Sequence, residues 1–540
     1  MNSKIINPSQ YKKITKDKNE KRTEKIERKI RRGKYEEINI VKDESSNDTN
    51  LSVKKRIIVG IVLICIMASL SILSASFFDL DKIEYIAVIN NVEENIVLNN
   101  DFEFKVGILN LDESKNVVIN ELKNKCYRKI LSFDEKYNIT LDLAENIDKK
   151  DSKTYVITFK EKSIKEKVKE KIENIIQDEK NVYYSVMKNI SKLDFEGENS
   201  LAISLKEEND YFVYYLDFNV DNLEYSENLP YTYQFDSSKN VASFTRKEEN
   251  NSVLKKITVN NYNDSLGLVN DFKDGKIDMF LTSSDDDIKA LNRYDYNLKK
   301  YRDGESIFLL GNPKSKLFRE EEVRKAIAYS IDRNAIAKEI SLSYAEVIDI
   351  PYIYSEVSYK YDTYAVDSLL SSNKWEYKNG TYVKSLDNKN NLTLKIKILV
   401  NSDDNSRLLV ASMVKEMLEK NKIPVELIKV SSSKMNEALA KDDYDMAIAK
   451  VSLGVSPDIS YLYNYINITD EANEMINNIK NANVNLISSE INKLKDYISS
   501  KVLCIGIYAK NVDVITQKYL KGFEEINYMN IFSDLESISK

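Results

Sequence analysis

The chain has 540 residues, of which 42% are hydrophobic and 31% are charged, and its formal net charge is −6. This length exceeds what one hydrophobic core supports, so it predicts two or three folded units. The absence of histidine excludes Ser-His-Asp, Cys-His and histidine–metal chemistry in their usual forms.

A basic tail opens the chain. Residues 1–56 contain 17 Lys and Arg against 9 Asp and Glu, a net charge of +8. Mixed Lys, Arg and Glu between Lys12 and Glu37 indicate a solvated helix or a disordered segment. We interpret the tail as a topology-setting segment that also contacts anionic lipid, with a docking peptide as the alternative. It is too short for a helix-turn-helix and lacks interleaved aromatic residues, so no nucleic-acid partner is predicted.

Residues 57–78 form an uncharged apolar run, IIVGIVLICIMASLSILSASFF. About 20 apolar residues span a bilayer as a helix, so the run predicts one transmembrane helix. The Lys-Lys-Arg step before it places the N-terminus in the cytoplasm and the residues after it outside the cell membrane. A cleaved signal peptide would not follow such a long tail, and large aliphatic residues precede Cys65, unlike a lipoprotein signal. We predict an uncleaved, single-pass signal anchor.

Two further cysteines lie far apart in the external part. Cys126 and Cys504 each stand among apolar residues, and we interpret both as buried thiols. A disulfide between them is the alternative interpretation, because the sequence does not show how far apart they lie in space.

Strand and helix patterns alternate through the external part. Residues 155–161 and 201–205 read as strands, as does LKKITVNNY at 254–262. Residues 265–278 are predicted to form a helix that Asp274-Gly275 ends. Residues 279–283 are predicted to form a strand that ends in polar residues. The apolar face of this helix is predicted to hold Leu266, Val269 and Phe272. This order predicts an α/β unit.

A second α/β unit is predicted further along. Residues 392–400 alternate with period two and read as one strand, and 407–423 read as a helix. Residues 424–430 form the next strand, and 434–451 a helix running into a strand. The helix face at 407–423 is predicted to hold Leu409, Met413 and Met417. Two α/β units with a cleft between them are a ligand-binding architecture, because strand ends and helix N-termini converge on the gap.

Five collinear segments between about Cys126 and Phe523 read YRKILSFDEKYNITLDLAENIDKKDSKTYVITFKE, NDFKDGKIDMFLTSSDDDIKALNRYDYNLKKY, LFREEEVRKAIAYSIDRNAIAKEI, YDTYAVDSLLSSNKWEYKNGTYVK and CIGIYAKNVDVITQKYLKGF. These segments resemble the bacterial extracellular solute-binding proteins of family 5, which include the oligopeptide- and dipeptide-binding proteins of ABC importers. In the third, the resemblance implies a helix pair with Val323, Ile327 and Ile331 buried. Asp332 would cap the second helix.

The resemblance implies an α/β type II periplasmic-binding-protein fold with three lobes and a ligand cleft. The first lobe is expected to be discontinuous, formed by residues 84–128, 222–303 and 506–540. Residues 129–221 would form an extra lobe, and 304–505 the third lobe. Such proteins close around a ligand by hinge motion of pre-formed lobes.

The sequence departs from the family pattern where a ligand should bind. The family's GTGPY turn appears as ENLPYTY, which keeps Pro230 and Tyr231 but lacks both glycines. The family's G-F-N strand appears as FLLGNPKSK, which keeps Asn312. Asn312 and Tyr231 are therefore candidate ligand contacts.

A second departure concerns the carboxylate that fixes a peptide's amino terminus. The family's W-G-x-D-Y-x-D-P stretch appears as KVSLGVSPDISYLY (450–463), without tryptophan and with Gly454 near the aspartate position. Asp458 is the nearby carboxylate, and it could instead cap a helix after Pro457. We take Asp458 and Tyr461 as the other two candidate ligand contacts.

The resemblance and topology together predict a membrane-tethered extracellular protein that binds a peptide or similar small solute for an ABC transporter permease. The alternative is a degenerate solute-binding domain that acts as an envelope sensor or protein-interaction module. No enzyme activity, cofactor or metal site is predicted. The acidic run 285–287 is the best metal candidate, but consecutive acids at a helix start do not converge on one ion.

Overall fold

The computed structural model describes residues 102–113, 116–221, 229–247, 254–340, 345–387, 390–454, 456–523, 526, 531–532 and 535–539. All belong to one compact unit, Asn99–Lys540. The predicted tail and transmembrane segment, residues 1–56 and 57–78, lie outside the described residues. Within the described ranges, no helix is long and apolar enough to cross a membrane.

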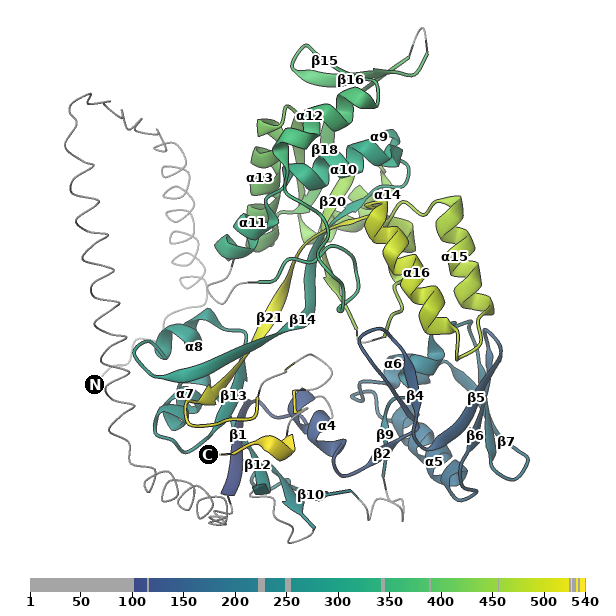
Figure 1. Ribbon diagram of the computed structural model, residues 1–540, viewed down its shortest axis with the longest axis vertical. Coiled ribbons are helices and arrows are strands. Elements are labelled where there is room, and N and C mark those ends of the chain that lie inside the picture. Colours follow the sequence, from purple (N-terminus) through teal and green to yellow (C-terminus); the bar gives the residue numbers. More distant parts are fainter. Residues whose placement is uncertain are drawn as a thin grey trace, which may run out of the picture. The chain divides into compact units, whose positions relative to one another are not determined.

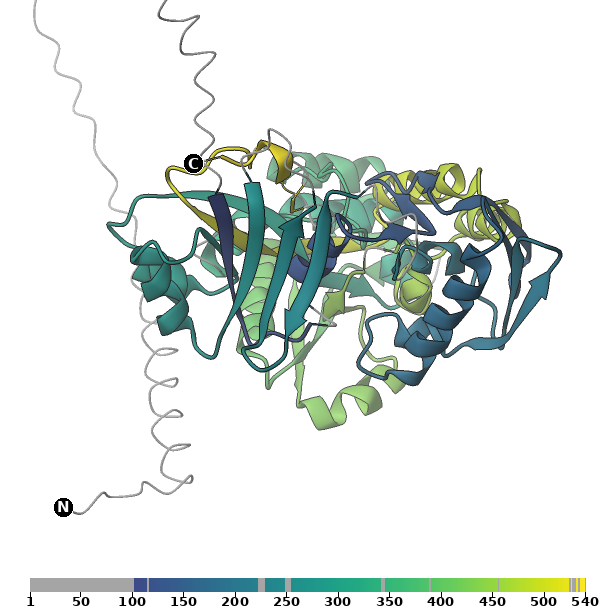
Figure 2. The same ribbon diagram turned by 90° about the horizontal axis from the view of Figure 1, so that it is seen from below.

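A ten-stranded mixed sheet is the main element, in the order β10-β11-β12-β1-β13-β21-β14-β20-β18-β19. Figure 2 shows the purple strand β1 beside the teal strands of one half. The strands are β1 (Phe102–Leu109), β10 (Tyr231–Asp236), β11 (Val241–Arg246), β12 (Leu254–Tyr262), β13 (Met279–Thr282), β14 (Tyr296–Gly311), β18 (Ile396–Asn401), β19 (Val425–Val430), β20 (Met446–Ser452) and β21 (Ile505–Gln517).

Two long antiparallel strands join the halves of this sheet. The 16 residues of β14 extend for about 50 Å at the usual rise of a strand. β13 pairs with one end of β21, and β20 pairs with the other end of β14. We name β10, β11, β12, β1 and β13 the first half, β20, β18 and β19 the second half, and β14 with β21 the connecting pair (Figure 1).

Helices complete the parallel connections in both halves, as the sequence predicts. α7 (Ser265–Lys273) joins β12 to β13, and α13 (Asn405–Lys420) joins β18 to the parallel strand β19. Each begins at an aspartate: the side chain of Asp264 accepts the Gly267 N–H at 2.7 Å, and Asp404 accepts that of Arg407 at 2.9 Å. These caps satisfy N–H groups that have no partner inside a helix.

The helix pair predicted around Asp332 is confirmed. Two residues separate α10 (Glu321–Ser330) from α11 (Arg333–Ile340), and the Asp332 carboxylate accepts the Ala335 N–H at 3.0 Å. Val323, Ile327 and Ile331 are all buried, although Ile331 lies just past the helix in extended conformation. The segment is therefore a structural element.

A second sheet forms the core of what we name the 129–221 region. Its order is β5-β6-β8-β7, from β5 (Ala144–Asp151), β6 (Thr154–Phe159), β7 (Ile190–Glu196) and β8 (Ser200–Leu205). Helix α5 (Ile164–Gln177) buries Ile164, Val168, Ile172 and Ile175, which recur at helical spacing. The 3₁₀ helix η1 (Phe212–Tyr215) closes the region.

Shorter elements connect these parts. The helices are α4 (Val117–Lys123), α6 (Tyr184–Met187), α8 (Asp285–Ala290), α9 (Lys316–Arg319), α12 (Thr363–Ser372), α14 (Met435–Ala440), α15 (Asp470–Asn481) and α16 (Ile487–Ser500), with 3₁₀ helices η3 (Ser432–Lys434), η4 (Ser460–Tyr465) and η5 (Leu535–Ser537). The short strands are β2 (Arg128–Lys129), β3 (Leu131–Phe133), β4 (Ile139–Leu141), β9 (Asn219–Val220), β15 (Trp375–Lys378), β16 (Thr381–Ser385) and β17 (Asn391–Thr393).

One continuous hydrophobic cluster joins the 129–221 region to the second half of the sheet and to α15 and α16. Figure 1 shows α15 and α16 beside the strands of the 129–221 region. Separate clusters lie against the first half and beneath α7. Cys126 and Cys504 lie in different clusters as free, buried thiols, which confirms the thiol interpretation.

Three predicted details differ from the structure. Residues 392–400 form two strands, because β17 joins the separate sheet β15-β16-β17 while β18 enters the ten-stranded sheet. Helix α13 buries Val410, Val414 and Leu418, one residue beyond the predicted stripe. In α7, Leu266 is 71% exposed and Leu268 is buried instead. The same apolar pattern is compatible with two neighbouring faces of a helix. The element that packs against the helix determines which face is buried.

Candidate ligand-binding site

The carboxyl ends of both strand groups face the same stretch of the connecting pair. β1, β12 and β13 run parallel to one another, and β13 ends where Thr282 lies opposite Asp513. β18 and β19 run parallel to β20, which ends where Ser452 lies opposite Glu305. Because β20 is antiparallel to β14 and β13 is antiparallel to β21, the two groups run toward each other. Ligands of α/β sheets bind beyond the carboxyl ends of the strands.

The connecting pair is irregular at this position. Arg302 lies opposite Asn511 and Ser306 opposite Ala509, so β14 holds two extra residues between these pairs. The carbonyl of Gly304 accepts the Leu453 N–H at 2.7 Å, and any Cβ at Gly304 would collide with the carbonyl oxygen of Leu453. A bulge bends a strand locally, so glycine here allows the close approach of β20 to the bend.

A charged triad lies beside the bend. The Glu305 carboxylate bonds to Lys450 of β20 and to Lys510 of β21. Partial burial acts to raise the pKa of Glu305, but the two lysine hydrogen bonds outweigh it and hold the pKa below its ordinary value. The triad joins β14, β20 and β21 by side chains as well as by backbone.

Asp458 stands in the turn that follows β20. Its carboxylate accepts the Ser460 N–H at 2.9 Å and so helps to begin η4, which carries Tyr461 and Tyr463. The bond closes a turn of the chain, but it is not a helix cap, because Ile459 is the N-cap residue of η4 and has no side-chain cap bond. The side chain is half-buried, and no Lys or Arg of the described residues lies within ion-pair distance of it.

Five tyrosine phenols from two parts of the molecule lie within electrostatic range of this carboxylate. Burial raises the pKa of each phenol, and the nearby negative charge of Asp458 raises it further, to about 12 for Tyr461 and Tyr463. The other three are Tyr211, Tyr215 and Tyr352. The hydroxyl groups of Tyr211 and Tyr463 lie 3.1 Å apart, which links the 129–221 region to η4.

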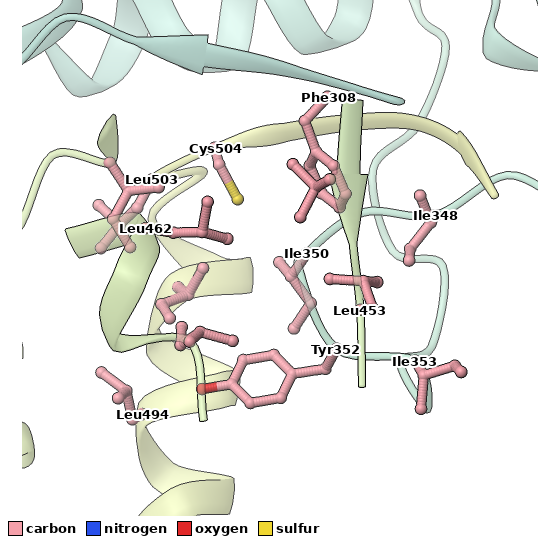
Figure 3. Packing of buried hydrophobic residues seen from close by; sticks show 14 of the residues in the cluster. Phe308, Ile348, Ile350, Tyr352, Ile353, Leu453, Leu462, Leu494, Leu503 and Cys504 are labelled. Atoms are coloured by element: carbon pink, nitrogen blue, oxygen red, sulfur yellow. The ribbon is translucent and has the colours of Figure 1, made fainter. Parts of the chain in front are cut away.

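Tyr461 is the exposed member and Tyr352 the buried one. Tyr461 is 50% exposed, and its hydroxyl donates to the Ser452 carbonyl at 3.2 Å, at the end of β20. Figure 3 shows Tyr352 among Ile350, Leu453 and Leu494. The Tyr352 hydroxyl is buried and has no hydrogen-bond partner in the described part of the chain.

The structure brings Asp458 and Tyr461 together but places Asn312 and Tyr231 elsewhere. Asn312 is buried, and its side-chain amide donates to the Tyr444 carbonyl at 2.9 Å, so it braces the turn before β20. Tyr231 is buried in β10, and its hydroxyl accepts a hydrogen bond from Arg246 at 2.9 Å.

Sequence reasoning did not select four of the five tyrosines. The chain has 35 tyrosines, so residue type alone does not separate these from the others. The spacing of Tyr461 and Tyr463 beside Asp458 was visible in the sequence. Tyr211 and Tyr463 lie 252 residues apart, and no local pattern connects them.

The acidic run in α8 is engaged within the fold. Asp287 is buried and accepts the Thr282 hydroxyl at 2.6 Å, and Asp286 pairs with Lys289 at 2.8 Å. No group of three or more His, Cys, Asp or Glu within the described residues is arranged to hold a metal ion.

The family described as bacterial extracellular solute-binding proteins, family 5 Middle, matches residues 127–473. The match covers more than half of the sequence, and the chain belongs to this family of solute-binding proteins. Its members bind solutes and are not enzymes. No curated protein matches the chain.

Solved structures share the fold. The chain is 16% identical to the nickel ABC transporter protein from Bacillus halodurans, with a TM-score of 0.61 and coverage of 81% of this chain and 99% of that one. An ABC transporter substrate-binding protein from Sinorhizobium meliloti is 15% identical, with a TM-score of 0.59 and coverage of 81% and 99%. The unliganded, open murein tripeptide-binding protein MppA is 14% identical, with a TM-score of 0.58 and coverage of 81% and 96%.

Proposed function

We propose that the chain is a membrane-tethered extracellular solute-binding protein that captures a peptide or similar small solute for an ABC transporter permease. The observation that carries the proposal is the convergence of two sets of strand ends on the bend of the connecting pair, beside Asp458 and Tyr461. Family membership supports the solute-binding role. Asp458 and Tyr461 are the proposed ligand contacts, whereas Asn312 and Tyr231 are buried away from this site.

We propose the same lobe boundaries that the sequence analysis predicts. The first lobe comprises residues 84–128, 222–303 and 506–540, the extra lobe 129–221, and the third lobe 304–505. The two-strand connection supports this division, because a ladder of two strands can bend as a hinge between packed parts. The ligand would bind between the first and third lobes.

The tether is the apolar run at 57–78, which lies outside the described residues. Its length and the basic residues before it support a signal anchor with a cytoplasmic N-terminus. Carbonate extraction of membranes from cells that express the full chain tests this. The full chain should remain in the membrane pellet, and its release by carbonate would contradict the tether.

The similar structures and the composition bear on the class of solute. One similar structure is of a nickel ABC transporter protein and another binds a murein tripeptide. The absence of histidine removes the commonest nitrogen ligand for nickel. A peptide or peptide-like solute is therefore favoured over a metal ion.

A thermal-shift experiment on the detergent-solubilised full chain tests solute binding. Ligand at 100 times its dissociation constant stabilises the folded state by about 2.7 kcal/mol, which shifts the melting temperature by several degrees. A pooled library of short peptides should give such a shift, and Asp458→Asn should reduce it. Asp178→Asn is the matched control, because Asp178 also accepts the N–H two residues on, at 3.0 Å, on an exposed turn.

The second candidate is a degenerate domain that acts as an envelope sensor or interaction module. The direct contact between the Tyr211 and Tyr463 hydroxyls favours it, since these groups already satisfy each other beside Asp458. Purification of the full chain from native membranes separates the two functions. Recovery of a permease supports solute delivery, whereas a different stable envelope partner and no shift with any solute pool support the sensor.

A further inference from the structure

A cavity of about 270 Å³ lies between helix α14 and one face of the second half of the sheet. Leu399 of β18 and Ile428 of β19, which lie opposite each other in the strand register, belong to its apolar lining. Val430 of β19 and Ala438 of α14 add to this lining. An apolar cavity of about 150 Å³ is large enough to hold benzene, so this cavity has room for an apolar group of that size.

The cavity is separate from the site at Asp458 and Tyr461. It extends to Asp443 and Tyr444, which precede the first residue of β20, whereas Asp458 and Tyr461 follow its last residue. The seven residues of β20 extend for about 20 Å at the usual rise of a strand. Binding in the cavity therefore needs neither the bend of the connecting pair nor a contact from the first half of the sheet.

The two faces of this part of the sheet are covered unequally. The buried side chains of the 16-residue helix α13 share one hydrophobic cluster with Ile398 and Val400 of β18. Side chains alternate between the faces of a strand, so Leu399 lies on the opposite face. On that face α14 has six residues and buries none of them. An apolar surface is thus left beside α14, and a ligand can cover it.

Four charged side chains also line the cavity. Glu437 pairs with Lys441 at 2.7 Å, and Asp443 pairs with Lys397 of β18. No carboxylate among the described residues lies within ion-pair distance of the fourth side chain, Lys434. An ammonium group and a carboxylate form a charge-assisted hydrogen bond. The cavity therefore combines an apolar floor with one uncompensated positive charge.

We propose that this cavity binds a small amphipathic anion, with its apolar group against Leu399 and Ile428 and its carboxylate on Lys434. Contact with the apolar floor removes nonpolar surface from water, and Lys434 selects the charge and orients the ligand. The inference goes beyond the proposed function, because this site is distinct from the one that captures the solute.

Isothermal titration with 3-phenylpropanoate tests the site. The full chain is reconstituted in lipid nanodiscs, and titration of empty nanodiscs measures partition into lipid. 3-Phenylpropanamide has nearly the same shape without the charge, and acetate has the carboxylate without the ring. 3-Phenylpropanoate should bind at least about three-fold more tightly than the amide, as expected for a partly exposed ion pair, and far more tightly than acetate. Equal affinity for the acid and the amide, or no binding of the acid, would overturn the proposal.

A lysine variant assigns the charge preference. Lys434→Gln keeps most of the side chain but removes the charge, so affinity for 3-phenylpropanoate should fall at least about three-fold. Lys429→Gln is the matched control, because Lys429 lies between Ile428 and Val430 in β19 and alternation places it on the other face. Unchanged affinity in Lys434→Gln, or an equal loss in the control, would refute the assignment.

Filling the cavity gives a second, independent test. Ala438→Leu adds apolar volume on the side of α14 that lines the cavity, and leucine is a good helix former. The variant should therefore fold, with a melting temperature no lower than that of the unaltered chain, but it should no longer bind 3-phenylpropanoate. Retained binding would place the ligand elsewhere.

The solute site supplies the last distinction. Asp458→Asn should reduce the thermal shift with the peptide pool and leave the affinity for 3-phenylpropanoate unchanged. If it weakens both, the anion binds at the solute site, and this inference fails while the proposed function stands. If the pool gives no shift but 3-phenylpropanoate binds in a way that depends on Lys434, the proposed function fails and this inference stands.

Discussion

Two junctions in this chain are built differently. The 129–221 region meets the second half of the sheet through one continuous cluster of buried side chains. The two halves of the sheet, within the described residues, meet along the ladder of β14 and β21. Packed cores resist deformation, whereas a bent two-strand ladder can flex with little loss of contact. We therefore expect any closing motion to bend the connecting pair, while Tyr211 stays in contact with Tyr463.

The largest expected effect on stability comes from the junction between the 129–221 region and the second half of the sheet, which we name the packed junction. Tyr137 is fully buried there, with its ring centroid 6.2 Å from that of Tyr352 and 6.1 Å from that of Tyr214. Tyr137→Ala should lower the free energy of unfolding by about 3–5 kcal/mol, because it removes a large buried ring. Chemical denaturation of the full chain measures this.

Tyr364→Ala is the control for this change. Tyr364 is 95% exposed in α12, and its loss should change stability by less than about 0.5 kcal/mol. If the two variants behaved alike, buried packing would not hold the 129–221 region in place.

The free energy of unfolding should depend on pH through Glu121 of α4. Burial raises the pKa of Glu121 to about 8, and Lys129, Lys125 and the Ile531 N–H only partly offset it. The carboxyl is then neutral when folded but ionised when unfolded, so its contribution is full below pH 4.5 and is lost as pH rises toward 8. Glu121→Gln should remove this loss and raise the free energy of unfolding by on the order of 2 kcal/mol at neutral pH.

Unfolding curves of both proteins between pH 5 and pH 8.5 check this sign. The stability advantage of Glu121→Gln should grow with pH and level off near 8. An advantage that did not change with pH would mean that Glu121 ionises normally in the folded chain.

A larger side chain at Gly304, in the connecting pair, should lower the stability of the protein. In Gly304→Ala the new methyl group collides with the Leu453 carbonyl at the bend, and such overpacking costs about 1–3 kcal/mol. Gly454→Ala is the control, since the nearest atom to its Cβ would be the Ser456 nitrogen at 3.8 Å. Thermal unfolding of both variants measures the difference, and equal melting temperatures would remove the special role of Gly304.

The smallest effect is expected from a surface ion pair at the packed junction. Lys480 of α15 and Glu208 of the 129–221 region lie 2.8 Å apart, but both side chains are exposed. Exposed pairs of this kind are screened by water and salt. Lys480→Ala should therefore leave the denaturation midpoint unchanged within error. A large loss would show that surface charges, rather than buried packing, fix the junction.

Local features of the fold were predictable because they depend on near neighbours. The Asp332 cap needs a carboxylate three residues before a free N–H, and the sequence shows both. Strand β12 matches its predicted bounds, 254–262, because alternation and β-branched residues mark it. The family was likewise identifiable from five ordered segments.

Features that depend on a distant partner were not predictable. The strand predicted at 392–400 divides because its first residues pair with β16 and its last with β19 and β20. The buried stripe of α13 lies one residue from the predicted one, because the sheet beneath it selects the face. Both outcomes follow from packing, which periodicity alone does not specify.

The sequence by itself was enough to predict the family and the alternation of strands and helices. It also excluded chemistry that needs histidine, and it selected Asp458 and Tyr461 as candidate ligand contacts. The tertiary structure decided what surrounds Asp458. Tyr211 reaches Tyr463 across 252 residues, and the strand ends that face the bend come from opposite halves of one sheet. A binding site depends on the distances between its side chains in space. Folding sets these distances for residues that are far apart in the sequence, so sequence spacing does not predict them.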